Sequence, residues 1–119
     1  MISEGLLWFI LDGFEFKIKG NMIHYLKTFE VEEDGELHYI NVEKSINIYE
    51  FVYEVKEFIS NYYKVFGTTK STSVGWFFWI DGIDKKFVGK TEYECVIKAG
   101  EWLIDKLLCK NTPPPEERP

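Results

Sequence analysis

The sequence predicts an α+β fold: an antiparallel β-meander of about six strands in the order ββββ-α-ββ-α, with two helices packed on one face. Two observations favour this class. Dipeptides that suit two-residue hairpin turns follow short apolar segments. Apolar residues then recur at helical spacing in two later segments. The 119 residues suit one domain, which we place at residues 1–110, followed by a mobile Pro-rich tail at residues 111–119.

The first four strands are expected within residues 7–43, joined by turns at Asp12-Gly13, Gly20-Asn21 and Asp34-Gly35. Counting outward from each turn gives a register, and all three registers place apolar side chains on a common face. The predicted pairs are Leu11–Phe14, Phe9–Phe16, Leu7–Ile18, Ile18–Ile23, Phe16–Tyr25, Val31–His38, Phe29–Ile40 and Lys27–Val42.

A helix is expected from Asn47, a good N-cap residue, with Glu50 in the capping-box position. Apolar residues continue at helical spacing to Phe66, and Gly67 suits the helix end. Residues 68–73, which are small and polar, are interpreted as a solvated connection.

The segment 76–89 partly repeats the segment 7–20: both read as a bulky strand, Asp-Gly, a shorter charged strand and a Gly. The predicted pairs of this second hairpin are Ile80–Ile83, Phe78–Lys85 and Trp76–Phe87. Phe77 and Trp79 then face outward, where we expect Trp8 and Ile10 to cover them partly, because a bare aromatic patch favours aggregation.

The second helix is predicted from Thr91 to Cys109, with Thr91 as N-cap and Glu94 in the capping-box position. A broad apolar stripe on this helix should pack on the sheet. Its residues are Val96, Ile97, Gly100, Leu103, Ile104, Leu107 and Leu108. Roughly opposite lie Cys95, Trp102 and Cys109, which are either scattered surface residues or an interface for a partner or a homodimer, with Trp102 as its anchor.

The net charge of −6 argues against a general nucleic-acid-binding protein. Residues 1–63 hold 12 acidic and 5 basic residues, whereas residues 64–90 hold 2 and 5. Cys95 and Cys109 lie about 21 Å apart along a helix, too far for a disulfide, and free thiols favour the cytoplasm. We expect no membrane span, because the apolar runs are short, and residues 1–16 lack the features of a signal peptide.

Catalytic, metal and cofactor patterns are not convincing in this sequence. The Gly-Lys-Thr at residues 89–91 resembles a phosphate-binding loop, but Asp84 occupies the position of its first Gly. His24 and His38 are predicted on opposite faces of the sheet, so they do not share a metal ion. We therefore expect no enzyme, cofactor or metal site.

The favoured function is a small acidic binding protein: an inhibitor, immunity protein or accessory factor whose partner is another protein, basic or nucleic-acid-binding. Its acidic candidates are Glu32, Glu33, Glu36, Glu50, Glu54 and Glu57. The alternative is a single-stranded nucleic-acid-binding module on the outer sheet face. Its candidates are Trp8, Phe77 and Trp79 for stacking, with Lys17, Lys19 and Lys86 for phosphates.

Overall fold

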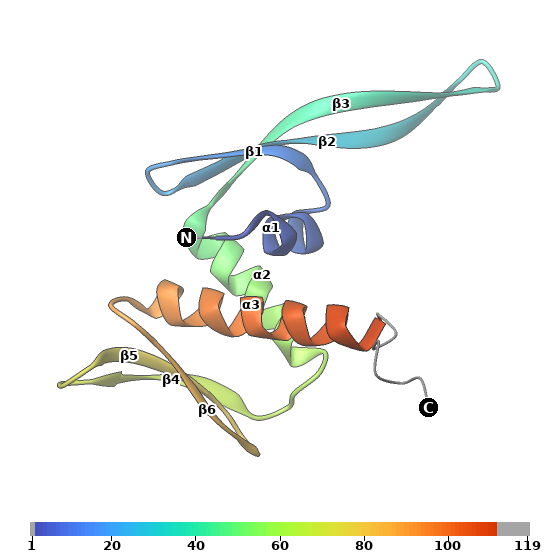
Figure 1. The fold of residues 1–119 in the computed structure, drawn as a ribbon. Helices are drawn as coiled ribbons and strands as arrows, with labels where there is room; N and C mark the ends of the chain where they lie inside the picture. The colour runs from blue at the N-terminus through green and yellow to red at the C-terminus, as the bar shows by residue number, and fades with distance from the viewer. Residues whose placement is uncertain (1, 112–119) are drawn as a thin grey trace, which may run out of the picture.

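Two three-stranded antiparallel sheets enclose three helices (Figure 1). The computed structural model describes the backbone of residues 2–111 and the side chains of residues 2–108. The elements are α1 (Glu4–Leu11), β1 (Phe14–Lys19), β2 (Met22–Glu33), β3 (Glu36–Asn47), α2 (Ile48–Ser60), β4 (Phe66–Ser71), β5 (Gly75–Ile80), β6 (Ile83–Gly89) and α3 (Glu92–Asn111). The predicted α+β class with six antiparallel strands is confirmed, although the strands form two sheets.

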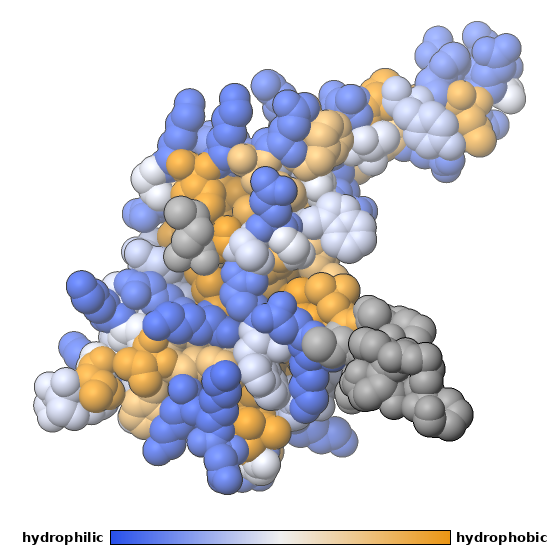
Figure 2. Space-filling model, viewed as in Figure 1, coloured by the Kyte–Doolittle hydropathy of each residue, from blue (hydrophilic) through white to orange (hydrophobic). Residues whose placement is uncertain are grey.

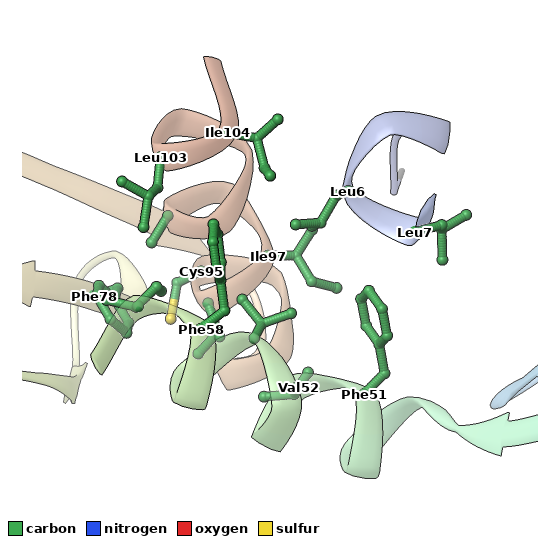
Figure 3. Packing of buried hydrophobic residues seen from close by; sticks show 14 of the residues in the cluster. Leu6, Leu7, Phe51, Val52, Phe58, Phe78, Cys95, Ile97, Leu103 and Ile104 are labelled. Carbon is green, nitrogen blue, oxygen red and sulfur yellow. The ribbon is translucent and has the colours of Figure 1, made fainter. Parts of the chain in front are cut away.

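Sheet A has the order β1-β2-β3 and sheet B the order β4-β5-β6, and the helices lie between them. The helix α3 packs across all three strands of sheet B, while α1 and α2 pack on α3 and on strands of sheet A. One cluster of buried residues includes side chains from all three helices and from both sheets. Figure 3 shows its part between the helices and Phe78 of sheet B. The helices therefore form the central layer of the molecule.

The position of α3 explains why its sequence carries two apolar stripes. Ile97 and Ile104 lie on the side of α3 that meets α1 and α2, whereas the Cys95 side chain points toward Phe78 of sheet B (Figure 3). Close packing with α2 depends on Gly100, because a Cβ atom there would lie 2.7 Å from Cγ1 of Val55. A helix between two layers needs an apolar face on each side.

Residues 4–11 form a helix, so the predicted strand at residues 7–11 is wrong. The hydroxyl of Ser3 caps this helix by accepting a hydrogen bond of 3.1 Å from the Leu6 backbone N–H. Leu6, Leu7 and Leu11 then lie buried on one side. The three pairs predicted across Asp12-Gly13 are therefore absent from the described structure.

The remaining registers of sheet A are largely confirmed. Ile18 pairs with Ile23, and the long hairpin of β2 and β3 pairs Val31 with His38, Phe29 with Ile40 and Lys27 with Val42. A bulge interrupts β1 between Phe14 and Lys17, where Glu15 has a φ of 52°. Phe16 and Tyr25 consequently do not form a regular pair, but their ring centroids lie 5.8 Å apart.

The helix α2 begins where its cap predicts. The side-chain oxygen of Asn47 accepts a hydrogen bond of 2.8 Å from the Tyr49 backbone N–H. Its buried residues include Phe51, Val55 and Ile59. The helix ends at Ser60 and not near Phe66, because residues 66–71 join sheet B as β4. The expected polar connection at residues 68–73 is therefore mostly a strand.

The hairpin of β5 and β6 keeps the predicted pair Ile80–Ile83, and a bulge then shifts the register by two residues. Phe78 pairs with Phe87, and Trp76 pairs with Gly89, in place of Lys85 and Phe87 respectively. A shift of two residues preserves the faces of a strand. Phe78 and Ile80 are accordingly buried beneath α3.

Phe77 and Trp79 lie on the outer face of sheet B, and their predicted contact with Trp8 and Ile10 is wrong. Those two residues belong to α1, and Trp8 is 59% exposed. The Trp79 ring instead lies over Gly67, where a Cβ atom would approach Cζ2 to 2.9 Å. Its indole N–H donates to the Thr69 hydroxyl at 3.1 Å, so β4 provides the cover.

The helix α3 begins after Thr91, as predicted. The Thr91 hydroxyl accepts a hydrogen bond of 3.3 Å from the Glu94 backbone N–H, and Glu94 also accepts one from the Lys90 N–H at 3.4 Å. Among residues 2–111, no helix is long and apolar enough to cross a membrane. Most of the predicted tail lies outside the described residues, which end with α3 at Asn111.

Candidate protein-binding surface

The most prominent surface feature is the outer part of the β2–β3 hairpin, residues 27–42, which we call the arm. The strand β1 pairs with β2 only as far as Leu26, so each strand of the arm has the other as its single neighbour in sheet A. The arm extends away from the helices (Figure 1), and nearly all of its residues are exposed. Both faces of a two-stranded ribbon are therefore available to a partner.

The arm is regular because its turn is suited to its sequence. Asp34 and Gly35 both have positive φ angles, 53° and 80°, as a type I′ turn requires. All twelve residues of β2 pair with β3 without a bulge. Side chains therefore alternate strictly between an inner face, which continues the buried side of sheet A, and an outer face.

The inner face of the arm is apolar in its middle and charged at both ends. Phe29 and Ile40 form its central pair and are 38% and 47% exposed. The ammonium groups of Lys27 and Lys44 lie 5.8 and 5.9 Å from the centre of the Phe29 ring. These cation–π contacts keep both lysines on this face.

The outer face of the arm is polar and acidic. The Thr28 hydroxyl donates to the Asn41 side chain at 2.8 Å, and the Tyr39 hydroxyl donates to Glu30 at 3.2 Å. Glu32 lies next on this face, opposite Leu37. Five of the seven residues 30–36 are acidic and none is basic, so the arm ends in a negative tip. Hydrophilic side chains gather at this end of the molecule (Figure 2).

The predicted acidic residues fall into two groups. Glu32, Glu33 and Glu36 lie at the tip of the arm, and all three are exposed. Glu50, Glu54 and Glu57 lie exposed along α2, and Glu50 and Glu54 line an open hollow with Ile46 at the base of the arm.

Sequence reasoning missed the tyrosines that accompany the acidic row of α2. Tyr49 and Tyr53 are 61% and 60% exposed, and both line the hollow at the base of the arm. The Glu57 carboxylate accepts a hydrogen bond from Tyr53 and, with its charge, raises the pKa of that tyrosine. Helical spacing from Glu50 and Glu54 would have indicated these positions, because they share the outer side of α2.

The structure changes the interpretation of Cys95 and Trp102, which were predicted opposite the broad apolar stripe of α3. Cys95 is fully buried against sheet B, as is its neighbour Ala99, so the prediction that Cys95 lies on the surface, alone or in an interface, is wrong. Trp102 is partly buried, with ring centroids 5.6 Å from Phe87 and 6.0 Å from Tyr63. A partner role for Trp102 stays a prediction, and the Cys109 side chain lies outside the described residues.

Burial also determines the chemistry of Cys95. Removal from water, and then the negative charge of Glu92, raise the pKa of its thiol to about 11. The thiol donates to the Glu92 carbonyl oxygen at 3.1 Å. Cys95 is therefore a protonated, free thiol at neutral pH, which does not suit it to nucleophilic chemistry.

The residues considered for nucleic-acid binding do not share one surface. Trp8 lies on α1 and Lys17 and Lys19 lie on β1, whereas Phe77, Trp79 and Lys86 lie on sheet B, beyond the layer of helices. The second group is compact, since the Lys86 ammonium lies 5.2 Å from the centre of the Phe77 ring.

The two histidines lie on opposite faces of sheet A, as predicted. His24 is opposite Ser45 on the outer face, whereas His38 is opposite Val31 on the inner face. Within the described residues, no group of three or more His, Cys, Asp or Glu side chains is placed to hold a metal ion.

The chain matches no protein-family model, and searches of curated proteins and of solved structures find no match.

Proposed function

We propose that this protein is a non-enzymatic binding protein, acting as an inhibitor, immunity protein or accessory factor, and that it presents the arm to a basic protein partner. The observation that carries the proposal is the arm itself. It is a long hairpin, exposed on both faces, and its tip combines five acidic residues. A regularly paired ribbon of this kind offers side chains and backbone to a groove at a lower entropic cost than a loop that must be ordered on binding.

The charge distribution supports a basic partner. Acidic residues on the outer face of the arm and on α2 give one sign of charge over a large part of residues 28–57. Such a field accelerates encounter with a positively charged surface and weakens as salt rises. A partner that normally binds nucleic acid has a surface of this kind.

The test is capture of partners from native lysate with the wild-type chain and with two charge-reversed variants. Glu30→Lys with Glu32→Lys changes the outer face of the arm, and Glu4→Lys with Asp105→Lys makes the same change in net charge at exposed sites elsewhere. We expect the arm variant to lose a partner that the control retains, with the larger difference between the two variants at low salt, where charges are least screened. Equal capture by both variants contradicts the proposal.

A second candidate function is single-stranded nucleic-acid binding on the outer face of sheet B. Phe77 and Trp79 lie there beside Lys86, and residues 64–90 are the basic part of the chain. Stacking on such a pair contributes about 1–3 kcal/mol per base. Titration with an oligonucleotide at low salt should quench the fluorescence of the wild type more than that of Trp79→Phe, and no quenching removes this candidate.

The proposed compartment is the cytoplasm. Cys95 supports it, because a free buried thiol is compatible with a reducing environment. Fractionation of cells that produce the protein, followed by immunodetection, tests this assignment.

A further inference from the structure

The inner face of the arm has a charge pattern that is complementary to itself when reversed. The rungs on this face, read from the pair just below the arm to its tip, are Tyr25 with Lys44, Lys27 with Val42, Phe29 with Ile40, Val31 with His38, and Glu33 with Glu36. In the first of these rungs Tyr25 is buried and Lys44 is exposed. The base is therefore cationic, the middle apolar and the tip anionic. Successive rungs are about 6.6 Å apart, so the pattern extends over about 26 Å.

From this pattern we infer that the arm binds a second copy of this chain, inner face to inner face and antiparallel. A two-fold axis through the central rung places Phe29 against Phe29 and Ile40 against Ile40 of the other copy. The same axis places each Lys44 opposite a Glu36, and each Val42 opposite a His38. An interface of this kind is isologous, which is the commonest arrangement of homodimers.

Exposure of the central rungs supports this occupant. Phe29, Ile40 and Val42 are 38%, 47% and 36% exposed, and the arm that carries them extends away from the helices (Figure 1). Isolated two-stranded ribbons are marginally stable, and a third layer or strand is the usual remedy. Stacking of two inner faces at about 10 Å covers the apolar side chains of both copies.

Charge complementarity selects a second copy over an unrelated apolar partner. Lys27 and Lys44 are held on this face by the Phe29 ring, and Glu33 and Glu36 form the last pair before the turn. In the antiparallel arrangement each cationic end meets an acidic end, whereas a parallel arrangement places like charges together. The charge pattern of the inner face thus favours a second copy as the partner and an antiparallel orientation of the two arms.

The inference can be tested separately from the proposed function, because the residues reversed in the two tests lie on opposite faces of the arm. Glu30 and Glu32 lie on the outer face, whereas Glu36 and Lys44 lie on the inner face. Variants at Glu30 and Glu32 should therefore keep the dimer, and failure of one idea leaves the other testable.

Two stacked ribbon faces about 26 Å long form a small interface, so we expect weak association. The experiment is therefore sedimentation equilibrium of the purified chain from about 1 μM to about 1 mM. We expect the wild type to form dimers. Lys44→Glu and Glu36→Lys should each weaken association about ten- to thirtyfold, because each change creates two repulsive pairs per dimer. Circular dichroism of each variant checks that the fold is retained.

Mixing the two charge-reversed variants provides the decisive test. An equal mixture of Lys44→Glu and Glu36→Lys restores both ion pairs in a heterodimer, and the double variant restores them in a homodimer, so both should associate like the wild type. Phe29→Ser should abolish association while leaving the fold intact. A wild type that stays monomeric, a mixture that fails to associate, or a Phe29→Ser dimer overturns the inference.

Discussion

Two segments with the same sequence pattern adopt different structures in this protein. Residues 7–11 and 76–80 are both runs of five bulky apolar residues followed by Asp-Gly and a charged strand. The first run belongs to α1, and the second forms most of β5. A short apolar run is thus compatible with either structure, and its surroundings decide between them.

The deciding residues lie just outside each run. Ser3 caps α1, and Leu6 extends the apolar run to a helical face that packs against the other two helices. The second run has Thr72 at the position of Ser3 but Gly75, with a φ of 90°, in place of Leu6, and it is paired with β4 on one side and β6 on the other. Local capping therefore favours the helix, whereas partners distant from the run favour the strand.

The largest expected contrast is between Phe78 and Phe9, which occupy the same position in the two runs. Phe78 is completely buried in sheet B, whereas Phe9 is 42% exposed on α1. Phe78→Ala should lower the free energy of unfolding by about 3–5 kcal/mol, and Phe9→Ala by about 1 kcal/mol. Denaturant unfolding measures both, and equal losses would mean that the runs have similar surroundings.

Gly13 and Gly82 follow the two aspartates and are needed for different reasons. A Cβ atom at Gly13 would lie 2.5 Å from Cδ2 of Tyr25 and 2.6 Å from the Leu26 carbonyl oxygen, whereas Gly82 has open space but a φ of 86°. Gly13→Ala should cost about 2–3 kcal/mol and Gly82→Ala about 1 kcal/mol. Thermal unfolding that ranks them in the reverse order would contradict the observed turn geometry.

The cap of α1 provides the next contrast. Ser3→Ala removes the acceptor for the Leu6 N–H and the hydrogen bond from the Ser3 hydroxyl to Glu101. The expected loss is about 1 kcal/mol. Thr72→Ala, which removes a hydroxyl from the exposed turn before β5, is the control and should stay within about 0.5 kcal/mol. Similar losses at both positions in denaturant unfolding would indicate that α1 does not depend on its cap.

The smallest expected effect concerns the aspartates themselves. Asp12 ends α1 with a φ of 54°, a conformation that glycine adopts more readily, so Asp12→Gly should stabilise the protein by up to about 1 kcal/mol. Asp81 is not among the residues with positive φ, so Asp81→Gly should destabilise it by about 0.5 kcal/mol. Thermal unfolding measures both, and changes of the same sign in the two variants would remove this distinction.

Features determined by adjacent residues were predictable from the sequence. Asn47 and Thr91 mark the starts of α2 and α3, and Asp34-Gly35 determines the register of the arm. These depend on hydrogen bonds and turn angles within a few residues. The acidic candidates of the arm and α2 were also found on the surface, because charged residues without partners seldom lie buried.

Features that depend on distant contacts were not predictable. The strand β4 contains Gly67, Thr68, Thr69 and Lys70, and such a polar segment becomes a strand only because β5 lies beside it. The division into two sheets and the burial of Cys95 both follow from the central position of α3. The projection of the arm was likewise missed, because no local pattern shows which face of a hairpin is left uncovered.

The central position of α3 has a consequence for the order of folding. Sheet B precedes α3 along the chain and lacks its apolar cover until residues 95–104 are in place, whereas sheet A packs on α1 and α2. The contact between Ser3 and Glu101, which joins α1 to α3, closes a span of 98 residues. The hairpins are local and form quickly, whereas closing this span is slow. During synthesis sheet B therefore stays uncovered until α3 has emerged, and in that interval it offers exposed apolar surface to chaperones.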